Sequence, residues 1–188
     1  PSLLNVADLQ ETSKFLRANN LFFNGAIADR SNIRGLISQL APNFLCNFLI
    51  SNGKFSIKPA VPVNSDGTIS TGAVPIKQLF TDGNILEDTF QLEYLAAEER
   101  QPFKAVVRYR KERQNKLPEE RAIDVRLKGQ EDLPIETFDL TQFCTSSEHA
   151  QLVARYFLLL RKLITHTVKF STTVHGLDLG AGDFIKVT

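Results

Sequence analysis

One stretch decides the fold of this chain: Thr145-Ser-Ser-Glu-His-Ala-Gln-Leu-Val-Ala-Arg-Tyr-Phe-Leu-Leu-Leu-Arg-Lys-Leu163. The Thr145 hydroxyl can accept a hydrogen bond from the backbone N–H of Glu148, and the Glu148 carboxylate can accept one from the N–H of Thr145. This capping box fixes the start of a helix. The spacing of the apolar residues that follow predicts one long apolar helix over residues 146–163.

The apolar residues of this helix form two neighbouring stripes, which together cover more surface than one core contact uses. One stripe consists of Ala150, Val153, Ala154, Phe157, Leu160 and Ile164. The other consists of Leu152, Tyr156, Leu159 and Leu163. Two interpretations stay open: the helix is buried deep in a single core, or it is sandwiched between its own sheet and a neighbouring subunit. In the second case, the second stripe is the subunit interface.

After Leu163 the hydrophobic period changes from helical to alternating. Residues 165–174 alternate and are rich in β-branched side chains, which predicts a half-buried strand. Gly176 ends this strand, and the segment Gly180-Ala-Gly-Asp183 suits a tight turn before a second strand over residues 184–187. The pattern therefore predicts a helix followed by a hairpin.

This ending resembles the hub modules of phage tail proteins of the tip-attachment, or baseplate-hub, family. In that family a long helix with alanines leads into strands that are closed by a Gly-Asp turn and an aliphatic strand. The matching residues are Ala150 to Leu163 for the helix, Val168 to Gly176 for the strand, and Gly182, Asp183, Ile185 and Val187 for the closing turn. Ala181 stands where the family more often has proline.

The order of the upstream segments is similar to the small α/β subdomain inside the same hub modules. Residues 21–27 are predicted to form a short strand, and Ser31 can cap a helix that Pro42 stops. The continuous apolar run over residues 44–50 predicts a fully buried strand. Asn52-Gly53 is a strong hairpin signal, so we expect a returning strand directly after it.

The middle of the chain has the pattern of β structure. Strands are predicted over residues 76–80, 89–94, 103–109 and 122–127, the last two as an antiparallel hairpin across a charged loop. Residues 135–140 are expected to link this sheet to the final helix. At the amino end, Asn5 can cap a helix from Val6 to about Ala18.

Together these elements predict an α+β fold. We expect antiparallel β-sheets or small β-barrel-like domains, a helix-plus-hairpin α/β subdomain and the long apolar helix near the C-terminus. The expected parts are an N-terminal helix or linker over residues 1–20, the small α/β subdomain over residues 21–62 and a β-rich hub domain over residues 63–188.

The composition argues against some classes of function but does not identify one. The 188 residues have a net charge of +1 and are 43% hydrophobic, so the chain as a whole gives no electrostatic case for nucleic acid or membrane binding. No apolar run is long enough to span a bilayer and no basic-then-apolar leader opens the chain, so we expect neither membrane insertion nor secretion. Cys46 and Cys144 have apolar neighbours, which favours buried free thiols over a disulfide between them. The start at Pro1 and the lack of methionine favour a fragment or a processed piece.

Residues 104–113 concentrate five cations against one acid, and the cations are Lys104, Arg108, Arg110, Lys111 and Arg113. They could form a basic strand against phosphate, and in a tail hub they could line the channel through which DNA leaves. The plainer interpretation is a strand with a solvated outer face. Acidic residues at positions 119, 120, 124, 131 and 132 could then pair with the cations across the strands.

A search for catalytic groupings finds none that local geometry could assemble. His149, His166 and His175 form no dyad, and the sequence has no GxSxG, HExxH, Walker loop or Rossmann glycine set. The pairs Glu98-Glu99 and Glu119-Glu120 are adjacent residues in charged loops, so they cannot serve as the two acids of a glycosidase. We therefore expect a protein that is not an enzyme and that uses neither a metal nor a cofactor.

The resemblance implies a structural component of a phage tail tip or baseplate hub. Such a chain would form an oligomeric ring, as a homotrimer, at the distal end of the tail tube and take part in tail assembly, host attachment and genome delivery. Its partners would be the tube or distal tail protein, the tape measure and fibres, with transient contact to DNA in the channel. It would be located in the virion after assembly in the host cytoplasm. The alternative is a monomeric β module that binds carbohydrate or nucleic acid.

Overall fold

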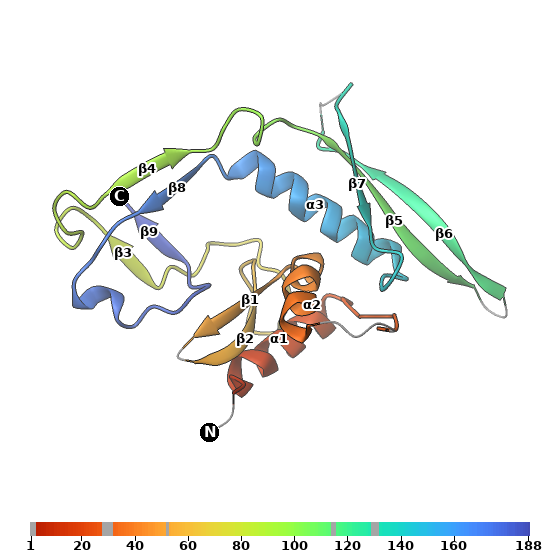
Figure 1. The fold of residues 1–188 in the computed structure, drawn as a ribbon, viewed down its shortest axis with the longest axis horizontal. Helices are drawn as coiled ribbons and strands as arrows, with labels where there is room; N and C mark the ends of the chain where they lie inside the picture. The colour runs from red at the N-terminus through yellow and green to blue at the C-terminus, as the bar shows by residue number, and fades with distance from the viewer. Residues whose placement is uncertain (1–2, 28–31, 52, 114–115, 129–131) are drawn as a thin grey trace. The chain divides into compact units, whose positions relative to one another are not determined.

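The computed structural model describes residues 3–27, 32–51, 53–113, 116–128 and 132–188 of the chain (Figure 1). The chain divides into two compact units. The first unit consists of Pro1–Asn19, Leu45–Leu95 and His166–Thr188, and the second unit consists of Asn20–Phe44 and Ala96–Thr165. The sequence interpretation divided the chain at residues 20 and 62, whereas each compact unit joins segments that are distant in sequence.

The first unit begins with helix α1 (Val6–Ala18), which has the predicted bounds and the predicted cap. The Asn5 side chain accepts a hydrogen bond from the Asp8 backbone N–H at 3.5 Å. The helix packs on strand β2 (Lys54–Pro59), with Phe15 fully buried and the buried Thr12 hydroxyl donating to the Ile57 carbonyl at 2.5 Å. The N-terminal helix therefore docks on its own unit through a polar anchor as well as an apolar side chain.

Strand β1 (Cys46–Ser51) pairs antiparallel with β2, and the register runs from Cys46 opposite Pro59 to Ser51 opposite Lys54. This confirms the predicted hairpin, although Asn52 of its turn lies outside the described residues. The expectation of a fully buried β1 was wrong, because Asn47 and Ile50 are exposed. A two-stranded ladder cannot cover both of its faces.

Among its described residues the first unit has two further ladders, each of two strands. Strand β4 (Gln91–Tyr94) pairs antiparallel with β8 (His166–Lys169), and β3 (Gln78–Phe80) pairs parallel with β9 (Ile185–Val187). The predicted final hairpin is therefore wrong, since its two strands take separate partners. Its turn is present: Gly182 has φ +88° and the Gly180 N–H donates to Asp183 Oδ2 at 2.7 Å.

Strand β8 is also shorter than the alternation over residues 165–174 predicted. After Lys169 the chain leaves the ladder and bonds to the loop that precedes β4: Ser171 accepts from the Leu86 N–H at 2.9 Å, and the Thr172 hydroxyl donates to the Asn84 carbonyl at 2.6 Å. A short 3₁₀ turn, η2 (Val174–Gly176), follows. Side-chain alternation reports which face a residue takes, but not whether a partner strand is available.

The second unit contains a three-stranded sheet in the order β6-β5-β7, covered by helix α3 (Figure 1). Strands β5 (Lys104–Arg113) and β6 (Lys116–Val125) form the predicted antiparallel hairpin. Strand β7 (Ile135–Asp139) runs parallel to β5 on its other edge, so the segment expected to be a linker is a strand. Within the described residues the strands form four separate sheets and no closed barrel, which corrects the barrel-like expectation.

Helix α3 (Ser147–Leu163) occupies the predicted place, but its cap differs from the prediction. Ser146 Oγ accepts from the backbone N–H groups of Glu148 and His149 at 3.2 and 3.4 Å. The Thr145 hydroxyl forms a different hydrogen bond, which it accepts from Asn24 Nδ2 at 2.7 Å. The helix is amphipathic rather than apolar all round, because charged and polar side chains follow one side. None of the helices in the described part of the chain has the length and apolar character to cross a membrane.

The remaining segment of the second unit packs beside the start of α3. Helix α2 (Ile33–Leu40) has the predicted extent, and Pro42 lies in the following 3₁₀ turn η1 (Ala41–Phe44). Its observed cap is Asn32, whereas the predicted cap Ser31 lies outside the described residues. The strand predicted at residues 21–27 was wrong: the segment is irregular and is held by a bond from the Asn24 N–H to the Phe143 carbonyl at 2.9 Å.

Candidate functional site: interaction surfaces

The inner side of α3 forms the core of the second unit. Ala150, Val153 and Ala154 of the helix are fully buried, as are Ala105 and Val107 of β5. Small residues on both elements allow the helix to lie close to the strand. The first predicted stripe of α3 is therefore a core stripe in its N-terminal half.

A cluster of aromatic and charged groups holds the C-terminal half of α3 on the same sheet. The rings of Phe138 and Phe157 stack at 5.0 Å, and the Arg161 guanidinium lies 4.3 Å above the centroid of the fully buried Phe103 ring. Arg161 also donates to Glu136 of β7, with Nη2 3.1 Å from Oε2. A cation over an aromatic face and a paired carboxylate both favour one orientation of the helix. The helix is thus a rigid support for whatever its outer side contacts.

The second predicted stripe, the candidate subunit interface, lies partly at the surface. Leu152 and Tyr156 are half-buried, whereas Leu159 is 43% exposed and Leu163 is 68% exposed. Ile164, directly after the helix, is exposed as well. The C-terminal end of α3 therefore presents adjacent apolar side chains that a partner could cover.

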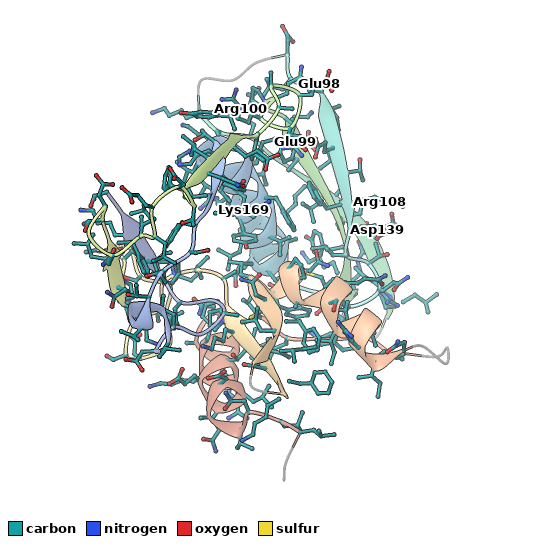
Figure 2. All side chains as sticks on the ribbon, turned by 60° about the vertical axis from the view of Figure 1, so that its left-hand side comes forward. Glu98, Glu99, Arg100, Arg108, Asp139 and Lys169 are labelled. Atoms are coloured by element: carbon teal, nitrogen blue, oxygen red, sulfur yellow. The ribbon has the colours of Figure 1, made fainter. Side chains whose placement is uncertain are left out.

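Among the candidate DNA-facing cations, Lys104, Arg108 and Arg110 lie on the face of β5 opposite to its buried residues, and most of the five are paired. Lys104 Nζ is 3.0 Å from Asp124 Oδ2 across the hairpin. Arg108 donates from Nε to Glu120 Oε1 at 2.6 Å and lies 4.0 Å from Asp139 of β7 (Figure 2). The hydrogen bond with Glu120 raises the pKa of Arg108. These three strands thus carry a network of exposed ion pairs.

The distal part of the hairpin shows the same arrangement. Arg113 forms an ion pair with Glu119, which also pairs with Arg121 at 2.9 Å. Arg110 donates from Nε and Nη2 to the Thr141 carbonyl at 3.1 and 2.8 Å, and Lys111 lies opposite Glu119 in the strand register. The cross-strand pairing expected in the plainer interpretation is therefore observed for Glu119, Glu120 and Asp124, whereas Glu131 lies outside the described residues.

The first unit has a cluster of ion pairs at the Gly-Asp turn. Asp183 lies 2.6 Å from Lys77 Nζ and 3.6 Å from Lys58 Nζ, and it accepts the Gly180 N–H. Burial alone would raise the pKa of Asp183, but the hydrogen bonds from Lys77 and Gly180 and the charge of Lys58 lower it overall. Asp183 thereby joins the C-terminal turn to β2 and to the segment before β3, which is a structural role.

An apolar surface that the sequence pattern indicated only as one face of a strand lies on β4 and on Phe90 directly before it. Phe90, Leu92 and Tyr94 alternate with polar residues and are 50%, 44% and 67% exposed. We call these three residues the β4 apolar face. The alternation itself was visible in the sequence, but it predicted a strand with one buried face. The alternation could not show that, among the described residues, no helix or second sheet covers these three side chains.

The potentially reactive groups are dispersed. His149 is buried in the second unit, His166 is exposed on β8 of the first unit, and the side chain of His175 lies outside the described part. Glu98, Glu99 and Arg100 belong to an exposed turn, in which Glu99 accepts the Ala96 N–H at 3.2 Å (Figure 2). Among the described residues no three side chains of the His, Cys, Asp and Glu types gather as metal ligands do.

Both cysteines are free and buried, as the sequence predicted. Burial raises the pKa of Cys46 to about 12 and also raises the pKa of Cys144. A thiol with a raised pKa is a poor nucleophile at neutral pH. Both residues therefore act as small apolar side chains.

Comparison with known proteins informs the fold. No family model matches the sequence, and no curated protein matches it. The fold is similar to a chain in the solved structure of the virion of a native gene transfer agent (GTA) particle, with a TM-score of 0.52 and 12% sequence identity. The likeness covers 94% of this chain and 40% of that chain, so the present chain spans less than half of its structural neighbour. At this identity the likeness concerns the fold.

Proposed function

We propose that this chain is a structural component of a virion, and more specifically a hub module at the tip or baseplate of a phage tail. The observation that carries the proposal is the fold likeness to a chain of a gene transfer agent virion, because it extends over 94% of the present chain. A likeness confined to one helix and hairpin would be expected of many unrelated proteins. Agreement over both compact units is harder to obtain by chance.

The hub role rests on the resemblance of the C-terminal third to the tip-attachment family. The helix of that resemblance corresponds to α3, and the closing turn corresponds to the segment in which Asp183 accepts the Gly180 N–H. In this proposal the chain has no reactive centre, and its mechanism is shape: β-rich modules pack around a conduit and carry further tail parts. Its partners are the tube or distal tail protein, the tape measure and fibres.

The proposed assembly is a homotrimeric ring in which the outer side of α3 is one contact. Leu159 and Leu163 supply apolar surface for it, and Leu152 and Tyr156 support them from half-buried positions. Apolar side chains on a rigid helix lose little conformational freedom on binding, which favours association. The ring would form in the host cytoplasm and remain in the virion.

Contact with DNA is a minor part of the proposal. Lys104, Arg108 and Arg113 already have carboxylate partners. A channel contact would then depend on Arg110 and Lys111, so binding of a DNA duplex should be weak and should disappear as salt is raised. A fluorescence anisotropy titration at low and moderate salt measures this, and tight binding that persists at moderate salt would favour the nucleic-acid-binding alternative instead.

Labelled particles test the location. A short epitope inserted between the exposed residues Thr71 and Gly72 should leave both units folded. In negative-stain images of particles made by cells that encode the tagged chain, antibody should decorate the distal end of the tail. Untagged particles are the control. Label over the head, or purified particles that lack the chain altogether, would refute the hub role.

A further inference from the structure

The β4–β8 ladder has an open edge next to an uncovered face. Within the described residues β4 has a hydrogen-bonded neighbour strand on one side only. The apolar face formed by Phe90, Leu92 and Tyr94 lies beside that edge, and Glu93 points to the opposite face of the strand. A two-stranded ladder is marginally stable by itself, and an open edge with apolar side chains attracts a further strand.

Strand β9 is open in the same way. It pairs only with β3 among the described strands, in a parallel ladder of two. Parallel strands occur almost always in larger sheets that are covered on both faces. Ile185 is 40% exposed and Lys186 is exposed, while Val187 is half-buried. The strand therefore offers free backbone groups and an alternating apolar-charged-apolar pattern.

The two open strands have complementary patterns. In an antiparallel pair, residues directly opposite each other point to the same face, and opposite charges at such positions attract. In one register, polar residues lie opposite polar residues, apolar residues lie opposite apolar residues, and the two opposite charges face each other. The opposed residues in this register are Gln91 and Thr188, Leu92 and Val187, Glu93 and Lys186, and Tyr94 and Ile185. A shift by one residue would set Glu93 against an apolar side chain, so the pattern specifies the register.

We propose that β4 of one copy of this chain binds β9 of a second copy as an added antiparallel strand. Main-chain hydrogen bonds hold the strand, and the Glu93–Lys186 pair selects its register. Each copy uses one surface to accept and a different surface to donate, and such a contact closes into a ring when the rotation between copies allows it. This inference rests on the proposed hub function only in that the contact would belong to a ring of copies. It goes further by naming the two strands that form the contact.

A charge exchange tests the pairing in the 188-residue chain. Glu93→Lys and Lys186→Glu are each expected to weaken self-association roughly tenfold, because each sets like charges opposite each other. The double variant Glu93→Lys, Lys186→Glu restores the attraction and should recover most of the lost affinity. Sedimentation equilibrium over a concentration series measures the association, and circular dichroism confirms that each variant folds. Association that is unchanged in the single variants overturns the proposal.

Cross-linking provides a second readout that does not depend on charge. Leu92→Cys and Val187→Cys are made in separate chains, which are then mixed and gently oxidised. The proposed register brings their Cβ atoms close enough for a disulfide, so a covalent dimer should form in the mixture. A mixture of Leu117→Cys, an exposed residue of β6, with Val187→Cys is the control. A chain that stays monomeric at every concentration and gives no more dimer than this control contradicts the proposal.

The outcomes separate this proposal from the proposed function. Tail-tip labelling with no effect of the charge exchange would keep the hub role and reject the strand pairing. Rescue by the double variant, with the chain absent from particles, would keep the pairing and reject the hub role. The two experiments measure different quantities, so neither result substitutes for the other.

Discussion

The two units of this molecule bury their apolar residues to very different extents. In the second unit α3 covers a three-stranded sheet, and Ala105, Val107, Val153 and Ala154 are fully buried. In the first unit the β4 apolar face and the β9 strand remain exposed on ladders of two strands. A sheet with a helix on it is a complete layered core, whereas a two-stranded ladder is not. The comparison teaches that the second unit completes its own core, whereas the first unit leaves exposed the surface that we propose a second copy covers.

The largest expected effect comes from truncating matched phenylalanines, one in each unit. Phe103→Ala should lower the free energy of unfolding by about 3–5 kcal/mol, because the ring is fully buried against Phe138 and Arg161. Phe90→Ala should cost less than about 1 kcal/mol in the monomeric chain, since half of that side chain is exposed. Urea unfolding followed by circular dichroism measures both. Equal losses would show that the first unit is as closed as the second.

A glycine pair in the second unit gives the next largest effect. A Cβ on Gly25 would clash with the Gln142 carbonyl oxygen, so Gly25→Ala should force the 21–27 segment away from its contacts and cost about 1–3 kcal/mol. Gly35 of α2 has no atom within 4 Å of the same position. Gly35→Ala should therefore stabilise the chain by about 0.4–1 kcal/mol. Thermal melting of the two variants should shift in opposite directions, and a shift in the same direction would contradict the close packing at Gly25.

Local signals in the sequence predicted much of this architecture. Asn5 and the spacing after it predicted α1, and the apolar period predicted α3 and the β5–β6 hairpin. Some errors concern elements, since residues 21–27 form no strand and β7 was expected to be a linker, but most concern the choice of partner strands. β7 and β9 both pair in parallel with strands that are distant in sequence, and no local pattern encodes such a choice. The cap of α3 is Ser146 rather than Thr145, and the Thr145 hydroxyl instead accepts from Asn24 Nδ2 of a segment distant in sequence.

The candidate surfaces were predictable to a similar degree. Charge order along residues 104–124 indicated that Lys104 and Arg108 could find carboxylates across the hairpin, and the structure has those pairs. The exposed end of the α3 stripe was one of two open interpretations. The β4 apolar face could not be found from sequence, because an alternating strand has the same pattern whether a second layer covers it or not.

A titration should separate the two units further. His149 lies between Phe44, 5.0 Å from its ring centroid, and the Asn43 carbonyl, which accepts from Nε2 at 2.8 Å. Burial lowers the pKa of His149 below its ordinary value of 6.5. As the pH falls below about 7, the unfolded chain binds a proton that the folded second unit does not, so the free energy of unfolding decreases toward the lowered pKa.

His149→Gln should remove that part of the pH dependence between pH 7 and pH 5.5. The parent chain, measured in parallel at the same pH values, is the reference. Urea unfolding at several pH values measures the slopes. If the parent chain and the His149 variant lose stability in parallel, burial of a neutral imidazole is not what limits stability there.

The smallest effect on stability is expected at Leu92. A small effect there would distinguish an interface residue from a core residue. Leu92→Ala removes an exposed side chain from a two-stranded ladder, so in dilute solution the free energy of unfolding should change by less than about 0.5 kcal/mol. If a second copy covers the β4 apolar face, the same substitution should weaken self-association, because the lost side chain is then buried. Unfolding at low concentration and sedimentation at high concentration give the two numbers. A residue that matters for association and not for folding belongs to an interface, whereas a large loss of stability in the monomer would assign Leu92 to the core of the first unit.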